Sequence, residues 1–503
     1  MKRSQRANLA SSPFQVKNTN PSNNTISSNV LILKASMRMF ILFLICLISF
    51  GEIAQGQSWQ DTIGQIDQLF DHYSSDNPGY QLAISRHGQI IYSRAQGMAD
   101  MERFTPLSKI SLIEAGSVSK QFTAAAILLL QQEGKLSLDD DVRKYIPELP
   151  SYGNTITLSQ MLHHTSGLKD WGSLMSLSDW PRGTKVYTNT EVLSIMTKQG
   201  SLNQEPGTVY AYSNTNYVLL AIIVERTSGE TLADFTRKRI FIPAGMNHTQ
   251  WRTDIRTIVP NRAIAYTKGE NGFYTDMPNE DVYGNGGLLT TAEDLLRWNI
   301  FYTSGKLGMP SLFPEQLHLV NLNNGQQNNY AAGLRIDFVK GRKVISHDGA
   351  TAAYRALLEY YPDEDVSIAW LSNNAESDKF TNDFTALHYL LFKTLQDLNT
   401  GISAPAAKPT YFHQIPSKLA DYIGKYYSNE VESGLFISLT EGKLIITRKN
   451  KSTFTLVRTA PDKFQISDSN VTVYFERGLN HKVKMLAFAT PKVHNVLFNK
   501  LPK

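Results

Sequence analysis

The stretch EAGSVSKQFTAAAILLL, residues 114–130, places Ser117 three positions before Lys120, and an almost wholly apolar run follows them. The run from Val118 to Leu130 has the apolar density of a buried helix, and residues three apart on a helix share a face. A helix N-terminus also offers free N–H groups that favour an oxyanion. The pattern fits a nucleophilic serine with lysine as its proton partner, and it fits equally a serine that caps a helix beside a surface lysine.

The S-x-x-K spacing alone does not choose between these two interpretations, because it occurs twice. Ser166 and Lys169 repeat it in HTSGLKDWG, where Gly167 and several turn formers disfavour a sustained helix. We therefore expect only the pair Ser117 and Lys120 to hold a fixed mutual geometry.

A second proton carrier could come from a Tyr-x-Asn motif, which occurs five times in the chain. Tyr212-Ser213-Asn214 differs from the others because it follows the turn EPGTVYA and leads directly into the apolar helix NYVLLAIIVER. A rigid helix entry positions a tyrosine hydroxyl better than a loop does. The alternative is that Ser213 or Asn214 simply caps that helix.

A third candidate segment is ISHDGATAAY, in which His347 and Gly349 stand at the end of a predicted strand. Glycine permits close approach of another backbone or of a ligand. The amide of Ala350 could then face the amide of Ser117 and form an oxyanion hole. A purely structural histidine is the alternative.

The sequence contains no motif typical of a metal site, an α/β-hydrolase or a phosphate-binding loop. His163 and His164 are adjacent, but no second ligand cluster and no H-E-x-x-H motif accompanies them, so we interpret them as turn and packing residues. The chain contains no G-x-S-x-G and no Gly-rich phosphate loop after a strand. We expect neither a metal nor an organic cofactor.

The pattern of segments predicts an α/β (α+β) fold. A hairpin is expected around His87-Gly88, and strands return in KVISHDG, YRALLEYYP and VSIAWLSN, with mainly helices and long loops over 134–290. Helices are predicted at 157–164, 189–199, 215–227, 231–240, 291–302 and 378–398. The working architecture is an antiparallel sheet flanked by helices with a mainly helical insert, followed by a small all-β sandwich or barrel-like domain.

The amino-terminal region indicates export. Residues 39–50, MFILFLICLISF, follow Arg38 and precede Ala54-Gln55-Gly56, which is the pattern of a secretory signal whose start could be Met37 or Met39. A run of this length is short for a membrane span, which needs about 20 residues. We expect a periplasmic or secreted protein without a stable membrane span, and the only cysteine, Cys46, lies inside the signal.

The net charge of +5 arises in the same region, because residues 1–56 hold six basic residues and one acid. The remaining chain carries 44 of each sign, so charge gives no reason to expect nucleic acid as a partner. The predicted division of the chain is an extension and signal at 1–56, a main α/β domain at 57–400, a linker at 401–410 and a β-domain at 411–503.

The order S-x-x-K, Y-x-N and H-x-G at Ser117, Tyr212 and His347 resembles the serine β-lactamase-like, penicillin-recognising hydrolases. The branch concerned includes class C β-lactamases, DD-carboxypeptidases, D-aminopeptidases and esterases. ITLSQMLHHTSGL, PAGMNHT and GNGGLLTTAEDLLRW also look like that family's recurrent segments. The resemblance covers roughly residues 59–398, and the tail is similar to a lipocalin-like β-domain often fused behind these hydrolases.

The resemblance implies roles for individual residues. Ser117 would attack a carbonyl and carry the acyl group, and Lys120 and Tyr212 would share the proton transfers, with the identity of the base left open. Asn214 would hydrogen-bond Lys120 and the substrate amide. Gly349 and Ala350 would line the acyl site, and His347 would stand where many relatives carry the lysine of K-T-G.

That histidine is a departure from the family pattern. Its ordinary pKa near 6.5 leaves it mostly neutral at pH 7, so it attracts a substrate carboxylate less than lysine would. We therefore expect an exported serine hydrolase acting on a small-molecule or peptide substrate, an amide or an ester, with weak or no β-lactamase activity. The alternative is a non-catalytic protein that binds cell-wall fragments. The sequence does not indicate an oligomeric state.

Overall fold

The computed structural model describes residues 60–502 except 72, 74, 182, 340, 393–417, 479 and 480. The predicted signal at 37–56, Cys46 and the predicted linker at 401–410 lie outside the described residues. Residues 60–70 form a helix, and the described residues from Leu69 onward belong to one compact unit. Among the described helices, none combines the length and the apolarity that crossing a membrane requires.

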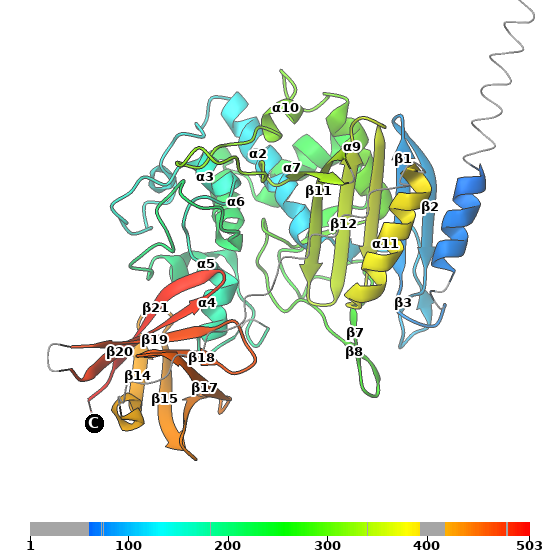
Figure 1. Cartoon of the computed structure of the whole chain (residues 1–503). Helices are drawn as coiled ribbons and strands as arrows, with labels where there is room; N and C mark the ends of the chain where they lie inside the picture. The colour runs from blue at the N-terminus through cyan, green and yellow to red at the C-terminus, as the bar shows by residue number, and fades with distance from the viewer. Residues whose placement is uncertain are drawn as a thin grey trace, which may run out of the picture. The chain divides into compact units, whose positions relative to one another are not determined.

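A six-stranded antiparallel sheet forms the centre of the fold (Figure 1). Its order is β10 (Arg335–Val339), β11 (Arg342–Thr351), β12 (Tyr354–Tyr361), β13 (Val366–Ser372), β1 (Tyr80–Arg86) and β2 (Gln89–Gln96). The predicted hairpin and the three predicted strands are therefore confirmed. The β1–β2 turn is made by His87 and Gly88, whose φ angles of 49° and 70° suit the right-handed twist of a hairpin.

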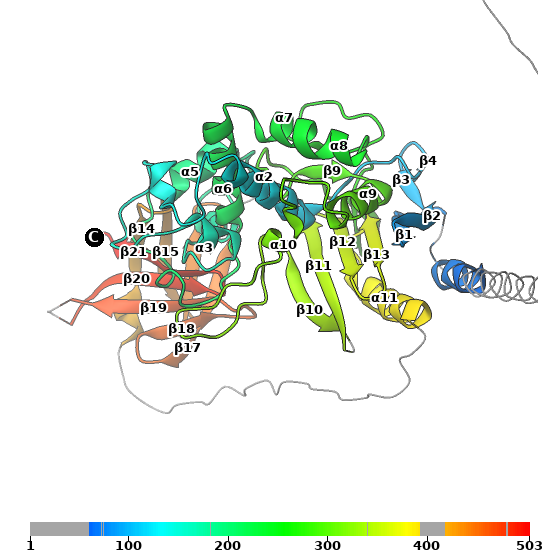
Figure 2. The same cartoon turned by 90° about the horizontal axis from the view of Figure 1, so that it is seen from above.

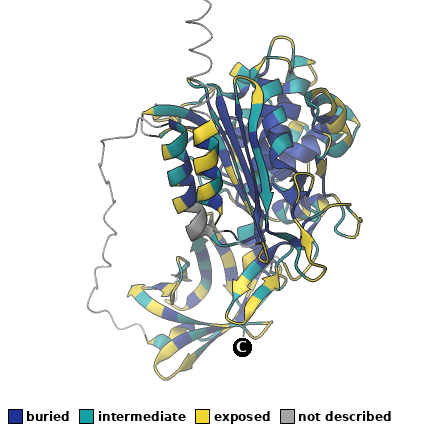
Figure 3. Ribbon diagram, turned by 90° about the vertical axis from the view of Figure 1, so that its right-hand side faces the viewer, coloured by how far each residue is buried: buried dark blue, intermediate teal, exposed yellow. Residues whose placement is uncertain are grey.

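Helices cover both faces of this sheet. Helix α9 (Ala292–Thr303) packs on β1 and β13, where Asn299 Nδ2 donates to Ser367 Oγ at 3.2 Å. Helix α11 (Ser377–Phe392) packs on the opposite face, with Phe384 against Trp370 of β13. Figure 3 shows the strands as predominantly buried between partly exposed helices. All seven residues of β13, VSIAWLS, are buried, and five of them are apolar, as burial on both faces requires.

The insert between β2 and β10 is mainly helical, as predicted, and is seen from above in Figure 2. Its two buried helices, α2 (Lys120–Gln132) and α6 (Asn214–Ser228), pack against each other, and the 3-10 turn η1 (Gly116–Ser119) leads into α2. The other helical elements are η2 (Val142–Lys144), α3 (Leu158–Leu162), α4 (Trp171–Leu177), α5 (Asn189–Met196), α7 (Leu232–Thr236), a π-helical turn (Arg237–Phe241), α8 (Ile242–Ala244) and α10 (Phe313–Gln316).

Seven short strands complete the insert as small separate pairings. They are β3 (Met98–Asp100), β4 (Thr105–Pro106), β5 (Ile113–Glu114), β6 (Gln250–Trp251), β7 (Tyr266–Gly269), β8 (Gly272–Thr275) and β9 (Leu288–Thr290). Strand β5 pairs with β9 directly before η1, so the serine turn is anchored on its amino-terminal side. These strands were not predicted from the sequence, because they are too short to show a period of two.

The carboxy-terminal region is a closed eight-stranded barrel, which decides between the sandwich and the barrel in favour of the barrel. Its strands are β14 (Gly424–Ser428), β15 (Ser433–Thr440), β16 (Lys443–Arg448), β17 (Thr453–Ala460), β18 (Lys463–Ile466), β19 (Thr472–Arg477), β20 (Val483–Thr490) and β21 (Val493–Lys500), and the turn η4 (Leu419–Tyr422) precedes them. Closure of the barrel depends on the pairing of the last strand with the first, because β21 pairs back onto β14.

Candidate active site

Ser117 lies in the 3-10 turn η1, with its side chain directed at Lys120 of the following helix. The distance from Lys120 Nζ to Ser117 Oγ is 3.0 Å. Ser117 does not cap the helix, because α2 begins at Lys120 and Ser119 is its N-cap residue. Ser117 is half-buried, whereas Gly116 and Val118 on either side are buried. The serine hydroxyl is thus held by the turn and remains reachable from outside.

Lys120 is completely buried, which excludes the interpretation as a surface lysine. Its Nζ donates to Asn214 Oδ1 at 2.9 Å and to the backbone carbonyl of Asn285 at 2.6 Å. Both partners are acceptors only, so they fix two of the nitrogen's hydrogens and direct the remaining position of Nζ toward Ser117. Asn285 belongs to another of the five Tyr-x-Asn motifs, and the sequence analysis did not select it.

Tyr212 completes the surroundings of the serine hydroxyl. Its Oη donates to Ser117 Oγ at 2.9 Å, and its ring lies 4.9 Å from Lys120 Nζ. The ring of His164 packs against it at a centroid distance of 4.2 Å. Burial raises the pKa of Tyr212 well above its usual value, so the side chain is a neutral phenol at pH 7.

Asn214, the first residue of α6, is oriented by Asp170. Asp170 Oδ2 accepts from the backbone N–H of Asn214 at 2.8 Å and from its Nδ2 at 3.1 Å, which turns Oδ1 toward Lys120. Asp170 is buried and is also the N-cap of α4, where Oδ1 accepts from the amide of Ser173. Asp170 was not among the residues predicted from the sequence, although it directly follows Lys169 of the second S-x-x-K motif.

The backbone of strand β11 touches the backbone of the turn η1, which carries Ser117. A Cβ added to Gly349 would lie 2.0 Å from the carbonyl oxygen of Ala115 and 3.1 Å from the amide nitrogen of Ser117. One added to Gly116, whose φ is +50°, would lie 2.7 Å from the amide nitrogen of Ala350. The two glycines therefore allow the segments that carry the amides of Ser117 and Ala350 to touch, as an oxyanion hole between them requires.

His347 is buried beside this contact and is saturated with hydrogen bonds. Its Nε2 lies 2.9 Å from Tyr330 Oη, and its Nδ1 lies 2.6 Å from the carbonyl oxygen of Asp348. The carbonyl can only accept, so Nδ1 carries the hydrogen and Nε2 accepts from the tyrosine. Burial and the charge of Lys120 lower the pKa of His347 to about 4, which outweighs the opposing effect of Asp348. The ring is neutral at pH 7.

The remaining candidates from the sequence have other partners. Ser166 Oγ donates to Asn216 Oδ1 at 2.6 Å, whereas the buried Lys169 pairs with Glu430 at 2.9 Å, so these two residues do not form a second serine–lysine pair. His163 and His164 are buried. Over the described ranges, no group of three or more His, Cys, Asp or Glu side chains is arranged to hold a metal ion.

Comparison with known proteins identifies the family of the chain. The family model described as Beta-lactamase matches residues 66–391. Penicillin-binding protein 4* of Bacillus subtilis (strain 168) is 32% identical over 311 residues, which are 58% of this chain and 67% of that protein. A D-aminopeptidase of Gluconobacter oxydans (strain 621H) is 27% identical over 300 residues, or 59% of this chain and 56% of that protein.

Among solved structures, the octameric penicillin-binding protein homologue from Pyrococcus abyssi superimposes with a TM-score of 0.53 at 20% identity, covering 88% of this chain and 99% of that one. This likeness concerns the fold. The chain spans 67% of the length of the Bacillus subtilis relative and 56% of the length of the Gluconobacter oxydans relative. The family model alone covers well over half of the chain, and the chain therefore belongs to the beta-lactamase family of serine hydrolases.

Proposed function

We propose that the chain is an exported hydrolase that cleaves a peptide, amide or ester through an acyl-enzyme on Ser117. The observation that carries the proposal is the serine hydroxyl bonded to both Lys120 Nζ and Tyr212 Oη, beside the close contact of β11 with the serine turn. Nucleophilic catalysis requires an alcohol next to a base, with donors near the carbonyl oxygen. The D-aminopeptidase relative supports a peptide or amide as substrate.

The contacts of Ser117 with Lys120 and Tyr212 support a division of the proton transfers between these two residues. Lys120 in its neutral form keeps two N–H bonds, to Asn214 Oδ1 and to the carbonyl of Asn285, and its lone pair can take the proton of Ser117. Ser117 Oγ then bonds to the substrate carbonyl carbon, and the oxyanion lies between the amides of Ser117 and Ala350.

Collapse of this intermediate breaks the C–N or C–O bond of the substrate. The hydroxyl of Tyr212 gives its proton to the leaving amine or alcohol and regains one from Lys120. Water then attacks the acyl-enzyme, and the same groups return the proton to Ser117. Tyr212 suits the acid role because its raised pKa keeps it protonated beforehand.

The neutral state of His347 supports weak or no β-lactamase activity. A penicillin presents a carboxylate, and the ring of His347 offers no charge and no unused nitrogen to bind it. Acyl donors whose binding does not require a cation on strand β11, where His347 lies, are the better substrates.

The proposal is tested with an active-site serine probe and three proteins: the wild type, Ser117→Ala and Ser166→Ala. Ser166 is the matched control, because it is the other serine of the S-x-x-K spacing and is bonded to Asn216. We expect labelling of the wild type and of Ser166→Ala only. Equal labelling of Ser117→Ala would exclude Ser117 as the nucleophile.

A panel of p-nitrophenyl esters, D-amino-acid amides and nitrocefin then separates an enzyme from a binding protein. Turnover that depends on Ser117 supports the hydrolase and excludes the non-catalytic alternative. If the folded wild type binds wall fragments but turns over none of the substrates, the proposal fails. Export is supported by the apolar segment 39–50 alone, and the amino-terminal sequence of protein recovered from the periplasm or the medium tests it.

A further inference from the structure

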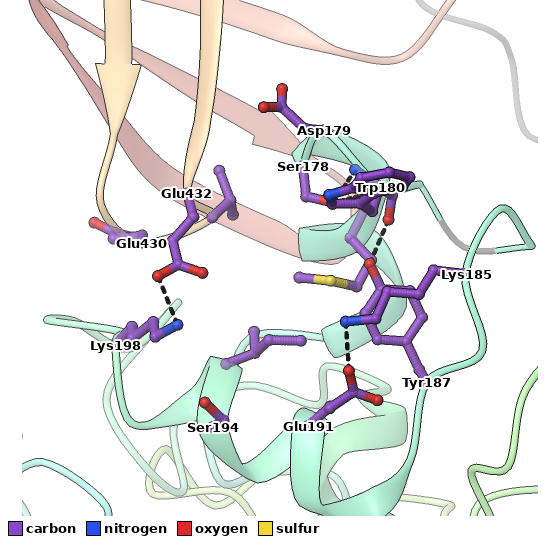
Figure 4. A pocket seen from close by; sticks show the side chains of 13 residues that line it. Ser178, Asp179, Trp180, Lys185, Tyr187, Glu191, Ser194, Lys198, Glu430 and Glu432 are labelled. Atoms are coloured by element: carbon purple, nitrogen blue, oxygen red, sulfur yellow. Dashed lines mark hydrogen bonds and ion pairs between the residues drawn. The ribbon is translucent and has the colours of Figure 1, made fainter. Parts of the chain in front are cut away.

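The barrel is docked beside the catalytic residues through two of its turns. The first is the β14–β15 turn, where Glu430 pairs with the buried Lys169 and Glu432 pairs with Lys198 of the insert at 2.8 Å. Figure 4 shows this region, in which Lys198 contacts Glu432 directly and both residues line a cavity of about 240 Å³. The charged groups drawn at this cavity pair largely with one another, as Lys185 does with Glu191. The first turn therefore acts as an anchor.

The second turn, Pro491–Lys492 between β20 and β21, reaches the active site itself. The backbone carbonyl of Lys492 accepts from Asn203 Nδ2 at 2.9 Å and lies 3.5 Å from the amide nitrogen of Asp170. Asn203 Oδ1 in return accepts from the amide of His494 at 2.7 Å. Asp170 is the residue that orients Asn214. The backbone of this turn is thus fixed to the segment that supports the catalytic lysine.

The side chain of Lys492 carries a charge to the mouth of the site. Its Nζ lies 5.4 Å from the ring centroid of Tyr212, whose hydroxyl contacts Ser117. Lys492 is exposed, so its ammonium remains accessible to a ligand. A cation over an aromatic face is attracted to it and is held near that position while its hydrogens stay free to bind an anion.

Two other basic groups near the site are less suited to the same task. Lys120 is buried and committed to Ser117, Asn214 and Asn285. Arg335 of β10 pairs opposite Ser346, so it shares a face of the sheet with Ser346 and Asp348, and His347 and Gly349 point to the other face. Lys492, unlike Lys120, is an exposed cation that lies against Tyr212, the tyrosine bonded to the nucleophile.

We infer that Lys492, supplied by the barrel, binds an anionic group of the substrate and makes the enzyme selective for acyl donors or leaving groups that carry a carboxylate near the scissile bond. The inference rests on the proposed function and specifies its substrate class. The barrel thereby supplies a cation beside Tyr212 from an element other than β11, on which His347 is neutral.

The test compares two substrates that differ only in charge, a p-nitroanilide or ester with a free carboxylate and its methyl ester or carboxamide counterpart. The measured quantity is the ratio of the two kcat/KM values. In Lys492→Met, which keeps the aliphatic stem on Tyr212, we expect the ratio to fall about tenfold, mainly through KM of the carboxylate substrate. Lys492→Arg should preserve the ratio, and added salt should lower it in the wild type.

Two further variants complete the design. Lys484→Ala removes an exposed lysine of β20 and serves as the matched control, with an unchanged ratio expected. Arg335→Met tests the other cation. An unchanged ratio in Lys492→Met, an equal loss of both substrates, or a selective loss confined to Arg335→Met would overturn the inference.

Melting temperatures of all variants show whether the barrel remains docked.

The failure of this inference is distinguishable from the failure of the proposed function. If the wild type turns over both substrates in a Ser117-dependent manner without preference, only the carboxylate selectivity is wrong. If neither substrate is turned over, the hydrolase proposal itself fails.

Discussion

Asp170 accepts two hydrogen bonds from Asn214, one from its backbone N–H and one from its side-chain amide. A buried carboxylate with these bonds determines which way the amide of Asn214 faces, and thus where Lys120 finds its acceptor. Asp170 itself has no contact with Ser117 among the described interactions, so we regard it as a positioning residue.

Replacing Asp170 by alanine should reduce kcat by about 10- to 100-fold, because hydrogen bonds to a charged group contribute about 1.5–3 kcal/mol each. The loss should appear in kcat more than in KM, since it concerns the orientation of Lys120. Steady-state kinetics with one ester substrate measure it. Ser173→Ala removes a different bond to the same carboxylate and should lose far less activity. Similar losses in both variants would contradict the positioning role.

Tyr212→Phe removes the proton donor of the leaving group and leaves the ring that packs on His164. We expect kcat to fall about 10²- to 10⁴-fold, as is usual when a general acid is lost. The effect should be smaller for p-nitrophenyl esters, whose leaving group needs little protonation, than for amides. An equal loss for both classes of substrate would argue against the acid role, and an unchanged melting temperature would exclude misfolding as the cause.

Gly349→Ala should disable the oxyanion site by pushing β11 away from the serine turn. The added Cβ would meet the carbonyl of Ala115 at 2.0 Å, and such overpacking costs about 1–3 kcal/mol or more. Both the free energy of unfolding and the rate of acylation should fall. Gly200→Ala is the control, because its Cβ would meet no atom within 4 Å. A Gly349→Ala protein with normal acylation would show that the amide of Ala350 is not needed.

The buried pair Lys169–Glu430 should stabilise the docking of the barrel in a way that depends on both partners. Lys169→Met alone leaves Glu430 without its buried cation, and breaking such a pair costs about 3–5 kcal/mol. Denaturant unfolding should show this loss, and the double variant with Glu430→Leu should recover part of it. If the two single losses simply add, the ion pair contributes little coupling.

The stability of the protein should fall on acidification below pH 6.5, partly because of His347. Its pKa is about 4 in the folded state and 6.5 in the unfolded chain, so between these values the unfolded state binds a proton that the folded state does not. Relative to His347→Gln, the wild type should lose up to about 1.4 kcal/mol of unfolding free energy per pH unit in this window. Identical slopes for the two proteins would show that His347 is not kept neutral.

Local sequence patterns predicted the sheet, the buried helices and the pairing of Ser117 with Lys120, because a period of two, apolar density and a spacing of three residues are local signals. They did not predict the supports of the site. Asp170 contacts Asn214 across 44 residues, and the carbonyl of Asn285 reaches Lys120 across 165. A contact made by a backbone carbonyl cannot be recognised from the identity of the residue that carries it. An aspartate that caps a helix cannot be told from other aspartates in the sequence. The contact of Lys492 with Tyr212 depends on how the barrel docks, which no pattern in either segment encodes.

The closure of the barrel has a temporal consequence. Strand β21 pairs back onto β14, and the turn that carries Lys492 immediately precedes it, so this turn is translated long after the last strand of the sheet. A nascent chain that contains the sheet and the insert already includes Ser117, Lys120 and Tyr212, but it still lacks Lys492. The order of elements along the chain thus places the reactive groups first and the group that we infer to choose among substrates last.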